Sequence, residues 1–60
     1  MKNKERKNVA KQLAALEEKL AKTTDLKEKE LIEREVILIC SKIQSMEDMI
    51  VIDEMVQSML

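Results

Sequence analysis

Apolar residues in the first third of the chain recur at alternating spacings of four and three positions. The residues that follow this spacing are Val9, Leu13, Leu16 and Leu20. Such a spacing is typical of a helix that packs along one narrow seam, as in a coiled coil. Alanines between these positions raise the helix propensity of the segment. The pattern therefore predicts a helix over residues 2–22 with a single apolar seam.

The pattern indicates one clear break, at residues 23–25. Thr and Asp side chains compete with the helix for backbone hydrogen bonds and therefore disfavour helix interiors. Asp25 is followed three residues later by Glu28, which matches a capping box with Asp25 as the N-cap. We therefore expect a turn over 23–25 and a second helix that begins near Leu26. One uninterrupted helix is the alternative, since no glycine marks the break.

Beyond residue 26 the same spacing continues and a second apolar row joins it on a neighbouring face. The first row is Ile32, Val36, Ile39, Ile43, Met46 and Ile50, and the second is Leu31, Leu38, Met49, Ile52, Val56 and Met59. This pattern predicts a long helix over 26–60. Ser45, with Asp48 three residues later, is also compatible with an N-cap and a short third helix from about Met46. The unbroken phase of Ile43, Met46 and Ile50 favours the continuous helix.

We therefore expect an all-α fold, an antiparallel helical hairpin in one module over residues 1–60. At about 1.5 Å per residue the second helix is the longer by about 20 Å, so its end overhangs the first. The overhang carries more apolar surface than a monomer normally exposes, and we expect most of it to pack against another chain in a helical bundle or coiled coil, rather than to fold back. The predicted hairpin seam is Val9, Leu13, Leu16, Leu20, Ile32 and Val36. The predicted protein interface is Ile39, Ile43, Met46, Met49, Ile50, Ile52, Val56 and Met59.

Composition supports this interpretation and narrows the chemistry. The 60 residues include no Gly, Pro, His or aromatic residue and only one cysteine, Cys40. Leu, Ile, Met, Ala, Lys and Glu are the residues of long helices and coiled coils. An intramolecular disulfide and a His- or Cys-rich metal site are excluded. A chain this small usually needs oligomerisation when it lacks disulfides and metals, so we expect a homo-oligomer or a larger protein partner.

Candidate catalytic groups are few. Cys40 follows the apolar run 36–39 and has no histidine to activate it, so we expect it to pack in the core. The carboxylates of the second helix alternate with bases, and Glu30 and Arg34 have the spacing of an exposed salt bridge. We therefore expect no enzyme activity, no cofactor and no metal. With 38% charged residues, a membrane span is not expected. The unpaired thiol and the lack of an export-signal pattern favour a cytoplasmic protein.

Charge is distributed unevenly along the chain. Residues 1–11 hold five bases against one acid, a net +4, whereas residues 46–60 hold four acids and no base, a net −4. The asymmetry favours protomers that pair antiparallel, with basic ends near acidic tails; two separately solvated ends are the alternative. The possible anion contacts are Lys2, Lys4, Arg6 and Lys7.

Two functions follow from these patterns. The first is a non-enzymatic helical interaction module that self-associates or docks on a larger protein as an adaptor, assembly or regulatory subunit. The second is a small nucleic-acid-binding or regulatory protein that uses its basic first helix. We rank it lower, because the aromatic residues that stack on single-stranded bases are absent.

Overall fold

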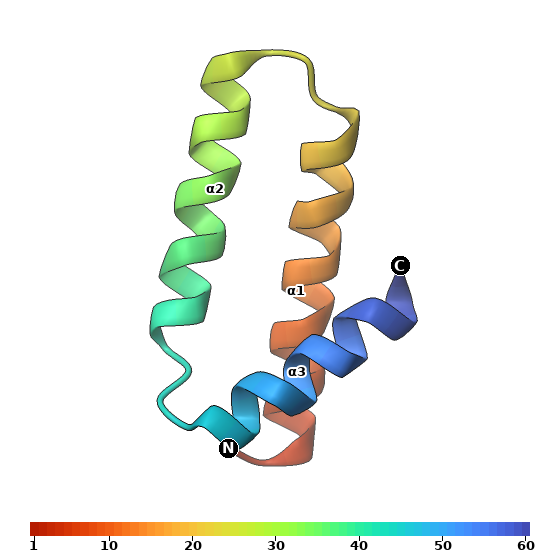
Figure 1. Cartoon of the computed structure of the whole chain (residues 1–60), viewed down its shortest axis with the longest axis vertical. Coiled ribbons are helices and arrows are strands. Elements are labelled where there is room, and N and C mark those ends of the chain that lie inside the picture. Colours follow the sequence, from red (N-terminus) through yellow and green to blue (C-terminus); the bar gives the residue numbers. More distant parts are fainter.

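The computed structural model describes all 60 residues and contains three helices (Figure 1). These are α1 (Asn3–Lys22), α2 (Leu26–Ser41) and α3 (Met46–Met59). No residue is in a strand, so the expectation of an all-helical chain is confirmed. No helix combines the length and the apolar character that a membrane crossing requires.

The turn between α1 and α2 forms where the sequence predicted it. The Asp25 carboxylate accepts a hydrogen bond from the backbone N–H of Lys27 at 3.1 Å, which confirms Asp25 as the N-cap. The capping box is not closed, however. The Glu28 carboxylate instead accepts a hydrogen bond from the hydroxyl of Thr23, at 3.1 Å, and so links the end of α1 to the first turn of α2.

The favoured prediction of one continuous helix over 26–60 is wrong, because residues 42–45 separate α2 from α3. The alternative of a break near Ser45 and a third helix from about Met46 is confirmed. The backbone N–H groups of Lys42 and Ile43 bond to carbonyls three residues earlier, at 3.2 and 3.1 Å, which closes α2 with a tighter turn. Ser45 then takes an extended conformation at the N-cap of α3. Its hydroxyl makes no capping bond, while its carbonyl accepts the N–H of Met49 at 3.1 Å.

The break allows the C-terminal third to fold back onto α1. Ile43, Ile52 and Val56 are all buried as a result. Burial of one such side chain stabilises the fold by about 1.5–3 kcal/mol, whereas each helical hydrogen bond lost at the break contributes about 1 kcal/mol. Folding back is therefore favoured over a straight helix that leaves these three side chains in water.

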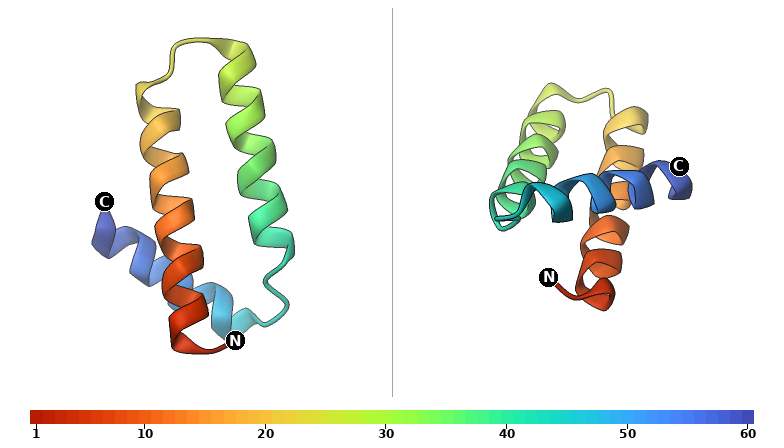
Figure 2. Two further views of the ribbon diagram at one scale, coloured as in Figure 1. Left: turned by 180° about the vertical axis from the view of Figure 1, so that it is seen from behind. Right: turned by 60° about the horizontal axis from the view of Figure 1, so that its bottom comes forward.

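Helix α1 is the centre of the fold. α2 runs antiparallel beside it, and α3 crosses its lower half at an angle (Figures 1 and 2). α1 packs against both other helices, while α2 and α3 hardly touch each other. The core consists of Ala10, Leu13, Ala14, Ile43, Ile52 and Val56. The small side chains of Ala10 and Ala14 permit the backbones of α1 and α3 to approach closely.

All six residues of the predicted hairpin seam are at least half-buried. Leu13 and Leu16 are buried, and Val9, Leu20, Ile32 and Val36 are half-buried. Helix α2 is nevertheless the least covered element, because it contributes no fully buried residue. The α2 residues that pack against the core are only partly buried, namely Val36, Ile39 and Cys40.

Candidate interaction surface

Two rows of apolar side chains lie exposed on α2. Leu31 and Leu38 are 59% and 62% exposed, and Leu26 and Ile37 are 79% and 66% exposed. The members of each row are a whole number of turns apart, so each row follows one line along the helix. The two rows flank the stripe through which α2 contacts α1. An arrangement of this kind leaves apolar surface of α2 available on both sides of that contact.

The total surface of the chain is large for its size. A folded monomer of 7.0 kDa exposes about 4,000 Å² by the usual scaling with mass. This chain exposes 4828 Å², an excess of about 800 Å², which is the area that one partner buries in a typical specific interface.

The predicted interface residues divide between the core and the surface. Met46, Met49, Ile50 and Met59 are exposed, and Ile39 is half-buried. Ile43, Ile52 and Val56 lie in the core of the same chain and are not presented to a partner in this structure. α3 thus covers part of the C-terminal apolar surface with α1, and packing of the exposed part against another chain stays a prediction.

A buried ion pair connects the basic start of α1 to the acidic start of α3. The Asp48 carboxylate is only 6% exposed and accepts hydrogen bonds from Arg6 Nε at 2.8 Å and from the Met1 α-amino group at 3.4 Å. Arg6 Nη2 lies 2.7 Å from the same carboxylate. The hydrogen bond from Arg6 is the main cause that lowers the pKa of Asp48 below its usual 3.8.

This pair changes the interpretation of the charge asymmetry. Basic and acidic ends do meet, but within one chain rather than between two protomers. Arg6 is held by Asp48, so of the possible anion contacts only Lys2, Lys4 and Lys7 are exposed. Asp48 lies four residues before Ile52, on the face of α3 that turns toward α1; that spacing is the sequence signal for a buried acid. The predicted pair of Glu30 and Arg34 is not formed, whereas Lys22 and Glu18 pair at 3.3 Å on the surface.

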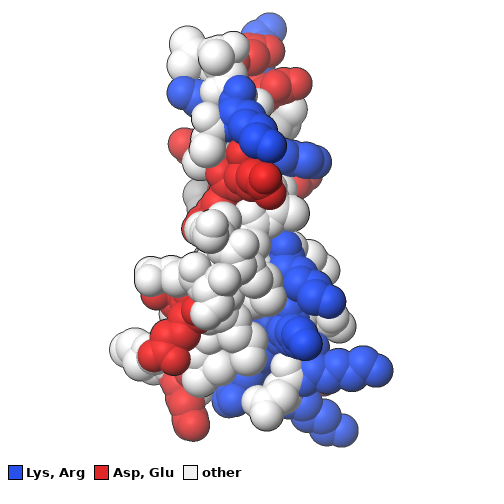
Figure 3. Space-filling view, turned by 90° about the vertical axis from the view of Figure 1, so that its right-hand side faces the viewer, with Lys and Arg blue, Asp and Glu red and all other residues white.

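The remaining charges separate onto different sides of the molecule. In the lower half of Figure 3, basic side chains gather on one side and acidic side chains on the other, with an uncharged strip between them. The exposed bases of this region include Lys4, Lys7 and Lys11 of α1. The exposed acids of α3 are Glu47, Asp53 and Glu54.

A groove runs between α1 and α2 on the side where α3 crosses. Its lower part is lined by Leu13, Glu17, Val36, Cys40, Met49, Ile52, Asp53 and Val56. Its upper part, of about 270 Å³, is lined by Glu17, Leu20, Glu33, Val36 and Ile37. The two parts share Glu17 and Val36 and are therefore continuous. We call these residues together the α1–α2 groove. The half-buried thiol of Cys40 lies in it, at the edge of the core rather than inside it.

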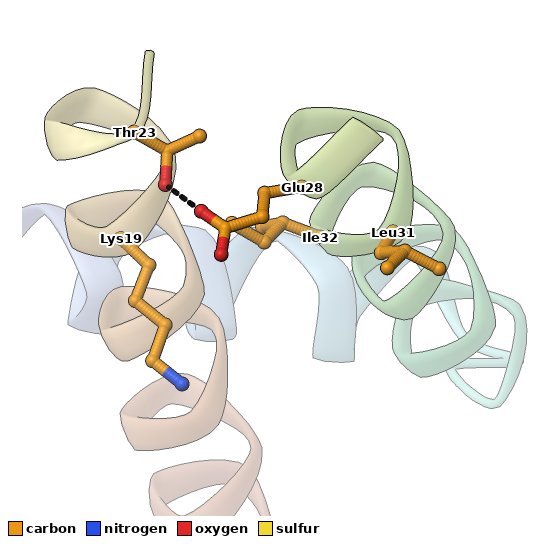
Figure 4. A pocket seen from close by; sticks show the side chains of 5 residues that line it. All are labelled: Lys19, Thr23, Glu28, Leu31 and Ile32. Atoms are coloured by element: carbon orange, nitrogen blue, oxygen red, sulfur yellow. Dashed lines mark hydrogen bonds between the residues drawn. The ribbon is translucent and has the colours of Figure 1, made fainter. Parts of the chain in front are cut away.

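A second hollow of about 390 Å³ lies under the turn between α1 and α2 and is lined by Lys19, Thr23, Glu28, Leu31 and Ile32. Figure 4 shows the Thr23 hydroxyl bonded to Glu28, while the amine of Lys19 points away from that bond. No three Cys, Asp or Glu side chains come together to hold a metal ion.

Comparison with known proteins finds no matching family model, no matching curated protein and no matching solved structure.

Proposed function

We propose that the chain is a non-enzymatic helical interaction module, which self-associates or docks on a larger protein as an adaptor, assembly or regulatory subunit. The observation that carries the proposal is the state of α2, which has no fully buried residue and exposes Leu26, Leu31, Ile37 and Leu38. A helix with apolar rows on both sides of its only contact is a docking element for further helices, as in a bundle.

The magnitudes indicate the strength of self-association. Covering Leu31 and Leu38, each about 60% exposed, contributes about 1–2 kcal/mol per side chain. Two copies that meet through this row therefore gain about 4–8 kcal/mol. Association itself costs about 4–15 kcal/mol in lost translational and rotational freedom. We accordingly expect weak self-association through one row alone, and tighter binding where a partner covers both rows.

The absence of an enzymatic role belongs to the same proposal. The chain has no histidine, and the thiol of Cys40 lies among Leu13, Val36 and Met49 with only carboxylates nearby in the groove.

Sedimentation equilibrium between about 0.1 and 2 mM tests self-association, because a gain of about 8 kcal/mol against the smallest association cost of about 4 kcal/mol leaves a dissociation constant of about 1 mM. We expect the mean mass to rise above 7.0 kDa with concentration. The double variant Leu31→Glu/Leu38→Glu should remain monomeric with unchanged helicity. A control, Gln12→Glu/Gln44→Glu, adds the same two charges at exposed polar positions and should associate like the wild type. Equal behaviour of the two variants would contradict a role for this row.

A second candidate function rests on the exposed lysines of α1. Lys4, Lys7 and Lys11 are each separated by about one turn and lie along one side of the helix, and Figure 3 shows that basic side chains gather on one side of the molecule. Such a row suits contacts to phosphates. If it binds nucleic acid, the affinity for a short duplex falls steeply with salt and is lost in Lys4→Gln/Lys7→Gln/Lys11→Gln. Binding that is absent at low salt would exclude this function.

A further inference from the structure

The upper part of the α1–α2 groove is left open by the rest of the chain. α3 crosses only the lower half of α1 (Figures 1 and 2), so Ile52 and Val56 fill the lower end of the groove. Above them Leu20, Val36 and Ile37 form an apolar floor. From Leu13 to Leu20 the groove follows α1 for about 10 Å, or two helical turns. This is the position that a further helix of a bundle would occupy.

The rim of the groove carries charge of one sign. Glu17, Glu33 and Asp53 are the charged residues that line it, and no lysine or arginine does. All three side chains are exposed. Arg34 directly follows Glu33 and Lys29 precedes it by one turn, but neither lines the groove. The two other hollows between α1 and α2 each include Lys19 in their lining, so the uniformly acidic rim is specific to this groove.

We infer that the α1–α2 groove binds a basic amphipathic helix of another protein. The inference rests on the proposed function and identifies the partner's chemistry. Apolar side chains at the spacings three and four would cover the floor, while flanking lysines or arginines would face the three carboxylates. Complementary charge of this kind selects the partner and its orientation.

A second copy of this chain does not supply such a helix. The basic face of α1 carries Lys4, Lys7 and Lys11, but the apolar seam of α1 is occupied by α2 and α3. α3, which keeps exposed apolar residues, has no base at all. α2 also exposes apolar residues, but it carries four acids against three bases and is therefore not a basic helix. The groove therefore fits a helix from a different protein better than it fits any surface of its own chain.

Cys40 offers a measurement of occupancy at the groove itself. It is the only thiol in the chain, is half-buried and lines the groove beside Val36 and Met49. A helix bound in the groove will slow its reaction with a thiol reagent such as a maleimide. Binding elsewhere on the surface will leave the reaction rate unchanged.

The experiment uses a synthetic peptide of about 18 residues, long enough to form a helix on binding. It is built from leucine and lysine, with leucines at the spacings three and four. A matched peptide replaces every lysine with glutamate. Affinity is measured by fluorescence anisotropy of the labelled peptide, and the reaction rate of Cys40 is measured in parallel. The groove variant is Glu17→Lys/Glu33→Lys. Its control is Glu18→Lys/Glu30→Lys, which makes the same change of net charge at exposed positions on the same two helices.

We expect the lysine peptide to bind the wild type, to slow the reaction of Cys40, and to lose at least about tenfold more affinity in the groove variant than in the control. The glutamate peptide should not bind. If the groove variant loses helicity, Glu33→Gln replaces it and Glu30→Gln serves as its control. The expected difference in peptide affinity between these two variants is then smaller, about threefold.

Three results would overturn the inference. The first is the absence of lysine-peptide binding. The second is an equal loss of peptide affinity in the groove variant and in the control, which would indicate unspecific charge attraction. The third is shielding of Cys40 by higher concentrations of the protein alone, which would place a second copy in the groove. If the peptide fails while sedimentation shows self-association through α2, the inference fails and the proposed function stands. If both fail, the proposed function fails as well.

Discussion

Replacement of Ile52 tests whether α3 folds back onto α1. Ile52 is the most completely buried large side chain, at 1% exposure, and it belongs to the core cluster that includes Ala10 and Leu13 of α1. In a continuous helix over 26–60 this side chain would lie in the overhang, away from α1. The variant Ile52→Ala therefore distinguishes the observed fold from the one that the apolar periodicity favoured.

The expected loss follows from the burial. Truncation of a buried isoleucine to alanine costs about 2–5 kcal/mol, because transfer free energy is lost and a cavity remains. A domain of 60 residues has a total stability of about 3–9 kcal/mol. Ile52→Ala is thus expected to remove about half of the unfolding free energy or more. The milder Ile52→Val should cost about 0.5–1.5 kcal/mol.

The matched control is Ile50→Ala, the same replacement two residues away on the same helix. Ile50 is 54% exposed, so its truncation should change the unfolding free energy by less than about 0.5 kcal/mol. Urea unfolding followed by far-ultraviolet circular dichroism, at low protein concentration, measures all three variants. Equal losses for Ile50→Ala and Ile52→Ala would refute the folded-back arrangement of α3.

Two further predictions concern the ion pair of Asp48 and the residues at the starts of α2 and α3. The folded-state pKa of Asp48 is depressed, so its contribution to stability is fully present above the usual value of 3.8 and is lost as the pH falls through the lower folded value. The urea midpoint should therefore drop less between about pH 5 and about pH 2.5 in Asp48→Asn than in the exposed control Asp53→Asn, which keeps the Asp48 carboxylate. Asp25→Ala should lower the unfolding free energy by about 1 kcal/mol, because its carboxylate caps α2. Ser45→Ala should lower it by less than about 0.5 kcal/mol, since its hydroxyl makes no capping bond; equal losses in the two cap variants would contradict this account of the helix starts.

The features of the fold that depend only on residues close together in the sequence could be predicted from it. The Asp25 cap is an interaction with the backbone two residues later, and the seam of α1 is a property of its own spacing. The end of α2 is different. Ile43 stays in phase across residues 42–45 and no Gly or Pro marks them. Ser45 and Asp48 gave a local signal for the break, but what decides for it is the apolar surface that the chain buries by folding back.

The candidate site shows the same division. Arg6 and Asp48 are 42 positions apart, and the sequence shows their opposite charges. Whether the two residues pair within one chain or between two chains depends on the path of α3. The acidic rim of the groove needs Glu17 of α1 and Glu33 of α2 to lie across from each other. That relation depends on how the two helices align, which the spacing within each helix does not specify.

Nuclear Overhauser contacts in a mixture of isotope-labelled and unlabelled chains test the central claim most directly. The account predicts that contacts between methyl groups of Leu13 and those of Ile52 and Val56 arise only within one chain. Contacts between chains at high concentration should instead involve Leu31 and Leu38 on the exposed side of α2. Contacts between Leu13 of one chain and Ile52 of another would contradict the account, because α3 would then complete the core of a partner and not of its own chain.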